Sequence, residues 1–237
     1  MTHELTVLAL TAASLGVLHT LLGPDHYLPF VMMSRAQRWS RSKTLLITAA
    51  CGLGHVFSSV VLGSIGIGLG LALTTMESLE SARGAIAAWG LIAFGGMYCA
   101  WGIRQALRHR PHTHWHDHQG GVVHSHEHRH ANEHMHAHQQ AGKANITPWI
   151  LFTIFIFGPC EVLIPVLMYP AAGKSLIGVI AVTLSFGVAT LVTMLAVVSI
   201  ALWGVKRIPG GKWERFTHAA AGAVICLSGV AIQALGL

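Results

Sequence analysis

The stretch HTLLGPDHYLPF, residues 19–30, gathers groups that can bind a metal ion inside an otherwise apolar region. It contains His19, Asp25 and His26 together with two prolines. An ionisable side chain at the centre of a bilayer costs on the order of 3 kcal/mol by insertion scales, so such side chains usually face one another or a polar cavity. We therefore expect these three residues to belong to a functional site rather than to a lipid-facing surface.

Three further residues of the same kind lie in other apolar segments. His55 stands in LGHVFSS, and Cys160 and Glu161 stand in GPCEVLIP. Imidazole combined with carboxylate suits Ni²⁺, Co²⁺ or Zn²⁺ better than Mg²⁺ or Ca²⁺, and the scarcity of thiolate argues against a Cu(I) cage. A lone membrane histidine is more often a hydrogen-bonded structural residue, and a proton relay serving another substrate is the main alternative for the group. The sequence predicts a metal site made of His19, Asp25, His26, His55, Cys160 and Glu161.

The prolines are expected to open the backbone close to these side chains. A proline inside a helix removes its own hydrogen bond to the carbonyl four residues earlier. Pro24 would free the carbonyl of Thr20, Pro29 would free that of Asp25, and GPCEVLIP repeats the arrangement. Freed backbone is tolerated at membrane depth only where protein buries it or a polar cavity solvates it. A plain proline kink is the simpler alternative, but its coincidence with the polar side chains favours a site.

The elements that must position these residues are membrane-spanning helices. Hydrophobic residues make up 53% of the 237-residue chain and charged residues only 10%, with a mean hydropathy of +0.57. Soluble domains average about 25% charged residues, and one helical crossing takes roughly 20 apolar residues. We predict an all-α integral membrane protein with six spans, at residues 4–22 (with a broken continuation to about 34), 43–74, 84–107, 147–170, 173–204 and 213–236. The first is read as a retained helix because it lacks a basic leader and carries Glu4.

Basic residues alternate between the loops that join these spans. The first, third and fifth loops are rich in Lys and Arg. The second loop has one basic residue, Arg83, and two acidic residues, Glu77 and Glu80, and the only basic residue of the fourth loop is Lys174. Loops with an excess of Lys and Arg stay on the cytoplasmic side. We therefore predict a multi-pass protein of the plasma (inner) membrane, with both termini outside. The net charge of +6 lies in loops and indicates topology, not a nucleic-acid partner.

An internal repeat relates the two ends of the chain. GPDHYLPF at 23–30 and GPCEVLIP at 158–165 share Gly-Pro, a polar residue, Leu and Pro. Each stands in the first helix of a three-helix half, and halves with an odd number of spans insert in opposite orientations. Residues 1–107 and 147–237 would then form two inverted repeats with broken helices 1 and 4, as in many secondary transporters. Chance similarity between two apolar segments is the alternative.

The segment 108–146 between the halves is rich in histidine. Residues 109–138 contain twelve of the seventeen histidines, many in an alternating H-x-H pattern. Such a segment cannot build a core, and we expect it to be disordered without metal and to act as a weak cytoplasmic metal trap. A tolerated low-complexity linker is the alternative. Whether His3, near the amino terminus, binds metal is left open.

Cysteine usage and the absence of a phosphate loop narrow the function further. Cys51, Cys99, Cys160 and Cys226 all lie in apolar segments without C-x-x-C spacing, so free buried thiols are expected. The chain has no G-x-x-x-x-G-K-[ST] loop that would bind ATP phosphates. Transport, if present, would be secondary, and no arrangement of nucleophile and oxyanion donors predicts an enzyme.

These motifs resemble those of a known superfamily. HTLLGPDH resembles the His-x-x-x-Gly-x-Asp-His signature of the hydrogenase/urease accessory nickel permeases (HupE/UreJ), and LGHVFSSVV is similar to the Leu-Gly-His-Ser-Thr segment of the nickel/cobalt transporters (NiCoT/NicO). GPCEVLIPVL is similar to the Pro-Cys segment of the efflux branch, which also tends to carry a His-rich loop. The resemblance implies that His19, Asp25, His26 and His55, with Cys160 and Glu161, carry the ion. The nickel/cobalt transporters usually space their first histidine one residue nearer the Asp-His pair and have eight helices. The Thr-Ala-Thr-Glu element of the uptake members is absent here, so substrate and direction are not assigned.

The sequence therefore predicts a secondary permease for Ni²⁺ and/or Co²⁺, with Zn²⁺ as a further substrate and no cofactor beyond the transported metal. Expected partners are the lipid bilayer and metal ions; a metallochaperone or metalloenzyme maturation protein and a homo-oligomer are further candidates. Two alternatives stay open: a sulfite or organosulfur anion exporter, and a non-transporting membrane metal sensor or accessory protein. The exporter would need a basic group at membrane depth, and no Lys or Arg stands at the centre of an expected span.

Overall fold

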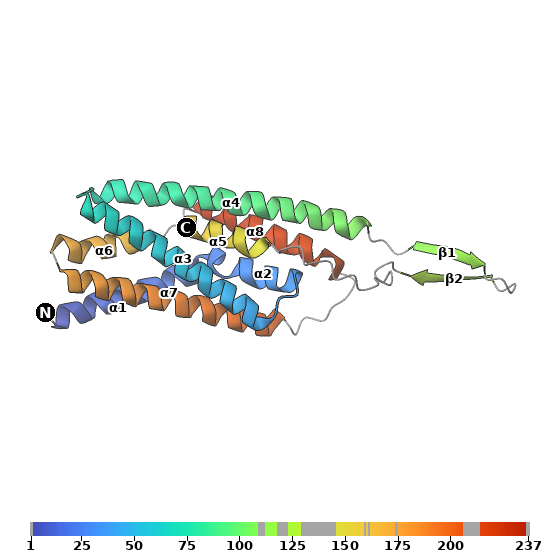
Figure 1. Cartoon of the computed structure of the whole chain (residues 1–237), viewed down its shortest axis with the longest axis horizontal. Helices are drawn as coiled ribbons and strands as arrows, with labels where there is room; N and C mark the ends of the chain where they lie inside the picture. Colours follow the sequence, from blue (N-terminus) through green and yellow to red (C-terminus); the bar gives the residue numbers. More distant parts are fainter. Residues whose placement is uncertain are drawn as a thin grey trace.

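The computed structural model describes residues 2–108, 112–117, 123–128, 146–158, 160, 162–173, 175–205 and 214–235. These residues form an elongated bundle of α-helices (Figure 1). Five segments are long and apolar enough to cross a membrane. They contain α1 (Thr2–Leu22), α3 (Arg41–Gly68), α4 (Leu73–Arg108), α7 (Leu176–Val205), and η3 (Glu214–Phe216) with α8 (Thr217–Leu235). The prediction of a helical, multi-pass membrane protein is confirmed, whereas the arrangement of six spans in two inverted repeats stays a prediction.

Two passages through the bundle, one of which begins with α1, are broken into shorter helices. In the first, α1 is followed by η1 (Pro24–His26) and α2 (Leu28–Ala36). In the second, α5 (Thr147–Phe157) and α6 (Leu163–Ala172) are separated by residues 158–162. Both breaks fall where the sequence predicts them.

The backbone at each break explains why the helix stops there. Gly23 (φ −84°, ψ 99°) and Gly158 (φ −60°, ψ 136°) are both extended rather than helical. Pro29 lies in the first turn of α2, where a proline interrupts no helical hydrogen bond. Our expectation that Pro29 frees the Asp25 carbonyl from a continuous helix is therefore wrong, because the helix has already broken before it.

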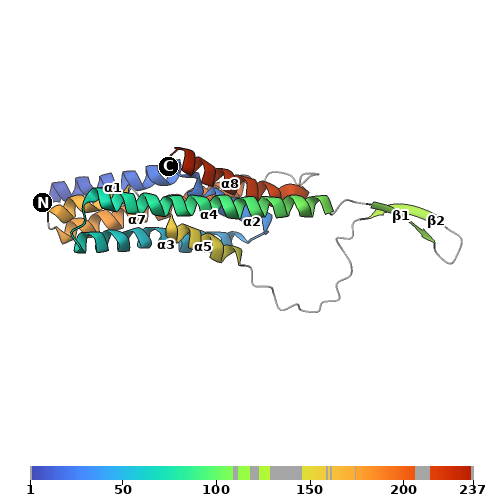
Figure 2. The same ribbon diagram turned by 90° about the horizontal axis from the view of Figure 1, so that it is seen from above.

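The helices pack in pairs along the length of the bundle, and the α4–α8 pair is antiparallel. α4 packs along α8, and α1 packs along α7, while α3 lies against α7 and α5 (Figures 1 and 2). The α4–α8 contact is close because glycines face backbone: a Cβ atom at Gly95 would lie 2.3 Å from the nitrogen of Cys226, and one at Gly222 would lie 2.2 Å from the nitrogen of Cys99. Small residues that let helix backbones approach are typical of membrane helix pairs.

The start of α4 differs from our expectation. The predicted span begins at residue 84, whereas α4 begins at Leu73, and only residues 69–72 separate it from α3. Glu77, Glu80 and Arg83, which we assigned to a loop, are therefore helical. Hydropathy argues against charged residues in a span, but it does not register that Glu80 is fully buried against protein.

Two strands lie in the histidine-rich segment. β1 (His112–Asp117) pairs antiparallel with β2 (Val123–His128), with His114 opposite His126. The two strands cover twelve residues of the segment 108–146, and the disorder that we expected for the segment as a whole stays a prediction. Residues 109–111, 118–122 and 129–145 lie outside the described part of the chain.

Burial in the bundle follows the pattern of a membrane protein. Large apolar side chains such as Leu46, Phe57 and Trp149 are exposed on the outside, whereas the polar side chains of His26 and His55 are buried. Lipid solvates an apolar exterior, and polar groups turn toward the interior of the bundle. The functional residues must therefore be sought inside.

Candidate metal centre

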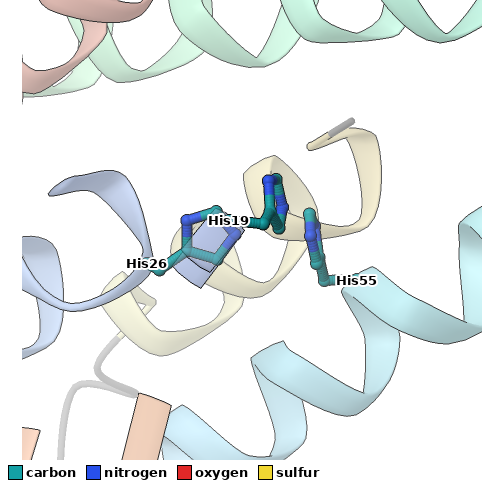
Figure 3. Close-up of side chains that lie close together, drawn as sticks. All are labelled: His19, His26 and His55. Carbon is teal, nitrogen blue, oxygen red and sulfur yellow. The ribbon is translucent and has the colours of Figure 1, made fainter. Parts of the chain in front are cut away.

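Three histidines from different elements converge inside the bundle. His19 lies in the last turn of α1, His26 ends η1, and His55 lies near the middle of α3 (Figure 3). Their ligand nitrogens lie within 4.8 Å of one another. His26 and His55 are 2% and 1% exposed. The structure thus brings together three of the six residues predicted to bind metal.

The break after α1 brings His26 close to His19. The Gly23 amide donates to the His19 carbonyl at 3.0 Å, and η1 follows directly. The rings of His19 and His26 then meet edge to face, 4.6 Å apart at their centroids. A Cβ atom at Gly23 would lie 2.4 Å from Nδ1 of His26, so this packing requires glycine.

The His26 ring is oriented by its neighbours through Nδ1. This nitrogen lies 3.2 Å from Oδ1 of Asp25 and 3.2 Å from the Gly23 carbonyl oxygen. Both are acceptors, so Nδ1 carries a proton and the neutral ring presents a lone pair at Nε2. Nε2 is buried and has no hydrogen-bond partner among the residues that the structure describes. Asp25 therefore orients His26, as carboxylates commonly do for metal-binding histidines, and is not itself one of the three clustered ligands.

Cys160 adds a thiol to the histidines. Its Sγ lies 3.0 Å from Nε2 of His55 and 3.9 Å from Nε2 of His19. His55 Nδ1 lies 3.4 Å from the Phe155 carbonyl oxygen, which leaves Nε2 to face the thiol. The thiol of Cys160 thus lies beside two of the three clustered imidazoles, those of His19 and His55. We call His19, His26, His55 and Cys160 the metal centre.

Glu161, the sixth predicted ligand, and Pro159 lie outside the described residues. The position that corresponds to Asp25 in the proposed repeat is occupied by Cys160. The two halves of the chain would therefore contribute different ligand types to one site.

A buried ion pair next to the metal centre was missed by sequence reasoning. Glu80, which is fully buried, and Arg83 pair across one turn of α4. Glu80 Oε2 accepts from the Cys160 amide at 3.1 Å, and Arg83 donates to the Ile156 carbonyl at 2.8 Å and to Ser58 Oγ at 2.8 Å. The Glu-x-x-Arg spacing in ESAR is a signal that could have extended the predicted helix backward, because such residues share a helix face.

A cavity of about 370 Å³ adjoins the histidines. Most of its wall is apolar, from α1, α4, α5 and α8, and includes Leu15, Leu18, Ala87, Leu91, Ile154 and Ile232. A four-coordinate ion with bonds of about 2.0–2.1 Å would hold its nitrogen ligands about 3.4 Å apart. The clustered nitrogens span up to 4.8 Å, so binding requires a small inward movement of these side chains.

Comparison with known proteins places the chain in a family. Residues 27–231 match the family described as cytochrome C biogenesis protein transmembrane region. Comparisons with curated proteins and with solved structures gave no match. The match includes His55 and Cys160 but begins after His26, so it gives no information about His19 or His26.

The family match corrects the resemblance to the nickel/cobalt transporter superfamily. That assignment rested on short motifs around broken helices, covering about a third of the chain. Polar residues beside Gly-Pro recur where a helix breaks in a membrane, so motifs of this kind do not separate families that share such breaks. The match extends over most of the chain and is to a different family. The chain belongs to the cytochrome C biogenesis protein transmembrane region family.

Proposed function

We propose that this protein binds a divalent transition-metal ion at the metal centre and moves it across the membrane as a secondary transporter. The family supports a membrane role of the cytochrome c biogenesis or thiol-redox transporter type. The observation that carries the more specific proposal is the meeting of three imidazoles and one thiol at two helix breaks inside an apolar bundle.

The unpaired nitrogen of His26 supports metal binding over a structural role. A buried polar atom without a partner costs about 1–3 kcal/mol, so such atoms are usually satisfied. His26 belongs to the cluster with His19 and His55, and its Nε2 is buried without a partner within the described ranges. A bound cation would satisfy it. Three nitrogen donors and one sulfur donor favour Co²⁺, Ni²⁺ or Zn²⁺ over Mg²⁺ or Ca²⁺.

The position of the metal centre supports transport over a fixed structural metal. Sites at broken helices near the middle of a bundle, shared by two repeats, are typical of secondary transporters. The α4–α8 contact supports the proposed repeat: Gly95 faces Cys226 and Gly222 faces Cys99, and one shift of 127 residues relates 95 to 222 and 99 to 226. We infer that residues 1–107 and 147–237 are the two inverted halves.

Thiol exchange is the second candidate, because the family match is compatible with a thiol-redox role and Cys160 lies 3.0 Å from an imidazole nitrogen. A histidine beside a cysteine can stabilise a reactive thiolate. However, all four cysteines of the chain are free, and the Cys160 thiol contacts imidazoles, not a second thiol. The geometry therefore supports metal binding better than exchange within the chain.

One expectation that we used against the anion-exporter alternative is corrected by the structure. We expected no basic group at membrane depth, but Arg83 lies in α4 and is largely buried. Its guanidinium is occupied by Glu80, Ser58 and the carbonyls of α5. A group already bonded in this way is a poor anion receptor, so no observation favours this alternative.

The test is metal flux into proteoliposomes containing a fluorescent metal indicator. We expect Co²⁺ or Zn²⁺ to enter liposomes that contain the purified wild-type protein. The His26→Ala variant should lose at least about 90% of that flux. Removing the hydrogen-bond partner of a metal ligand already lowers metal affinity or activity by about 10–100-fold, and removing the ligand itself typically costs more. His218→Ala is the matched control, because this histidine bonds to Tyr98 on another part of the bundle. Equal flux in wild type and His26→Ala would refute the proposal.

A further inference from the structure

We infer that Glu80 and Arg83 are positioning residues that hold the Cys160 thiol in the metal centre. The positive charge of Arg83 lies at the end of α5, and the negative charge of Glu80 lies at the segment that leads into α6. This inference deepens the proposed function and rests on it for the role of the thiol. The placement of Cys160 by the ion pair can nevertheless be tested without metal.

Arg83 lies against the end of α5. It donates to the carbonyl of Ile156 at 2.8 Å and to that of Gly158 at 3.4 Å. The last carbonyls of a helix have no partner within the helix and carry partial negative charge. A guanidinium with several donors can satisfy two of them and Ser58 Oγ together, which a single ammonium group does less well.

Glu80 lies against the chain that leads into α6. Its Oε2 accepts a hydrogen bond from the Cys160 amide at 3.1 Å, three residues before α6 begins at Leu163. The start of a helix carries partial positive charge, so a carboxylate is favoured there. Cys160 is thus fixed through its own backbone while its thiol points to His55 and His19.

The pair is better suited to positioning than to general stability. A buried ion pair is weak evidence for stability, because removing two charges from water costs about as much as their attraction returns. Here each charge also bonds to one side of the same break, so the pair fixes the distance between α5 and the start of α6. It thereby makes the fourth ligand depend on α4, a helix that contributes no ligand among the clustered residues.

The experiment measures reactivity of the Cys160 thiol toward N-ethylmaleimide in the full-length, detergent-purified protein. Cys51, Cys99 and Cys226 are replaced by Ala, so that Cys160 is the only cysteine of the chain. In this background the double variant Glu80→Gln/Arg83→Gln removes both charges and retains side chains of comparable length. We expect the labelling rate to rise about tenfold or more, because a thiol no longer held in the interior is exposed by local opening.

Two further variants keep the result interpretable. Glu77→Gln changes an exposed carboxylate one turn earlier on α4 and should leave labelling unchanged. Arg83→Lys keeps the charge with fewer donors and should give an intermediate rate; it also serves if the double variant does not fold. If the double variant folds and is labelled at the rate of the parent, the inference is overturned. If the double variant does not fold, the same result for Arg83→Lys overturns it.

Cobalt absorption separates this inference from the proposed function. The sole-cysteine parent with Co²⁺ should show near-ultraviolet sulfur-to-cobalt charge transfer, which the histidine-rich segment cannot produce because it contains no cysteine. The double variant should lose this band. A parent without the band but with labelling that depends on the pair would refute the metal centre and uphold the positioning role. A band that persists in the double variant would refute the positioning role.

Discussion

At the scale of single residues, the orientation of His26 explains why a carboxylate accompanies histidine in this membrane segment. Asp25 accepts from Nδ1, and the opposite nitrogen is left to face His19 and His55. Without that acceptor, Nδ1 would keep only the Gly23 carbonyl, and the ring would be held less firmly. Asp25 is therefore expected to act through His26.

We predict that Asp25→Asn weakens metal affinity by about 10–100-fold while the protein remains folded, the range seen when the partner of a metal-binding histidine is removed. Isothermal titration with Co²⁺ measures the affinity, and helical circular dichroism checks the fold. The substitution is nearly isosteric and keeps an oxygen that can accept from Nδ1, so an unchanged affinity would show that the negative charge of Asp25 does not support metal binding.

Residue types allowed most of the metal centre to be predicted. His19, His26 and His55 lie together, with His19 partly exposed, and Cys160 lies beside His19 and His55; that they bind metal stays a prediction. The separate role of Asp25 could not be predicted, because it depends on which nitrogen of His26 the backbone turn presents to it. Glu161 stays a prediction, since it lies outside the described residues.

At the scale of helices, the molecule depends on two breaks and on one close helix contact. The breaks at Gly23 and Gly158 bring side chains from distant parts of the chain to one level of the bundle. The contact between α4 and α8 holds together the third helices of the two proposed halves. Neighbouring glycines on α4 allow this contact to be tested.

We predict that Gly95→Ala destabilises the protein by about 1–3 kcal/mol, the usual cost of forcing an extra methyl group into a packed interior. Its Cβ atom would lie 2.3 Å from a backbone nitrogen of α8, and backbone cannot rotate away. Gly96→Ala is the matched control: its Cβ atom would meet nothing within 4 Å, and alanine favours the helix. Thermal unfolding in detergent should therefore separate the two variants, and equal melting temperatures would contradict the packing.

The helix breaks were predictable from Gly-Pro in the sequence, but the start of α4 was not. Glu80 and Arg83 are strongly polar, so a hydropathy criterion excludes them from a membrane span. Their contacts with the α5–α6 break explain why they are buried. Charged residues that are paired inside a bundle look from sequence like loop residues. The most informative residues outside the metal centre were therefore the ones that sequence reasoning placed in a loop.

At the scale of the whole molecule, an apolar exterior encloses the polar side chains of the metal centre in the described part of the chain. The multi-pass membrane architecture followed from composition, whereas the orientation of the loops stays a prediction. The family could not be identified from short motifs, because those motifs describe a broken helix with polar residues and the family match extends over residues 27–231.

We predict that the histidine-rich segment modulates transport without being required for it. Replacing the twelve histidines of residues 109–138 with Gln should retain metal flux in proteoliposomes, with a reduced rate at low metal concentration, because a weak trap raises local metal supply. A sensor or trap without transport would instead lose its metal response altogether. Flux that disappears in this variant would contradict the assignment of transport to the membrane centre.

The central claim is that three imidazoles and one thiol hold the ion, and X-ray absorption at the zinc edge tests it most directly. The variant with the twelve loop histidines replaced by Gln would be loaded with one equivalent of Zn²⁺. We predict about three nitrogen neighbours at about 2.0–2.1 Å and one sulfur neighbour at about 2.3 Å. Cys160→Ser should remove the sulfur shell and leave the nitrogen shell. A zinc ion surrounded only by oxygen or nitrogen in the protein that retains Cys160 would contradict the account.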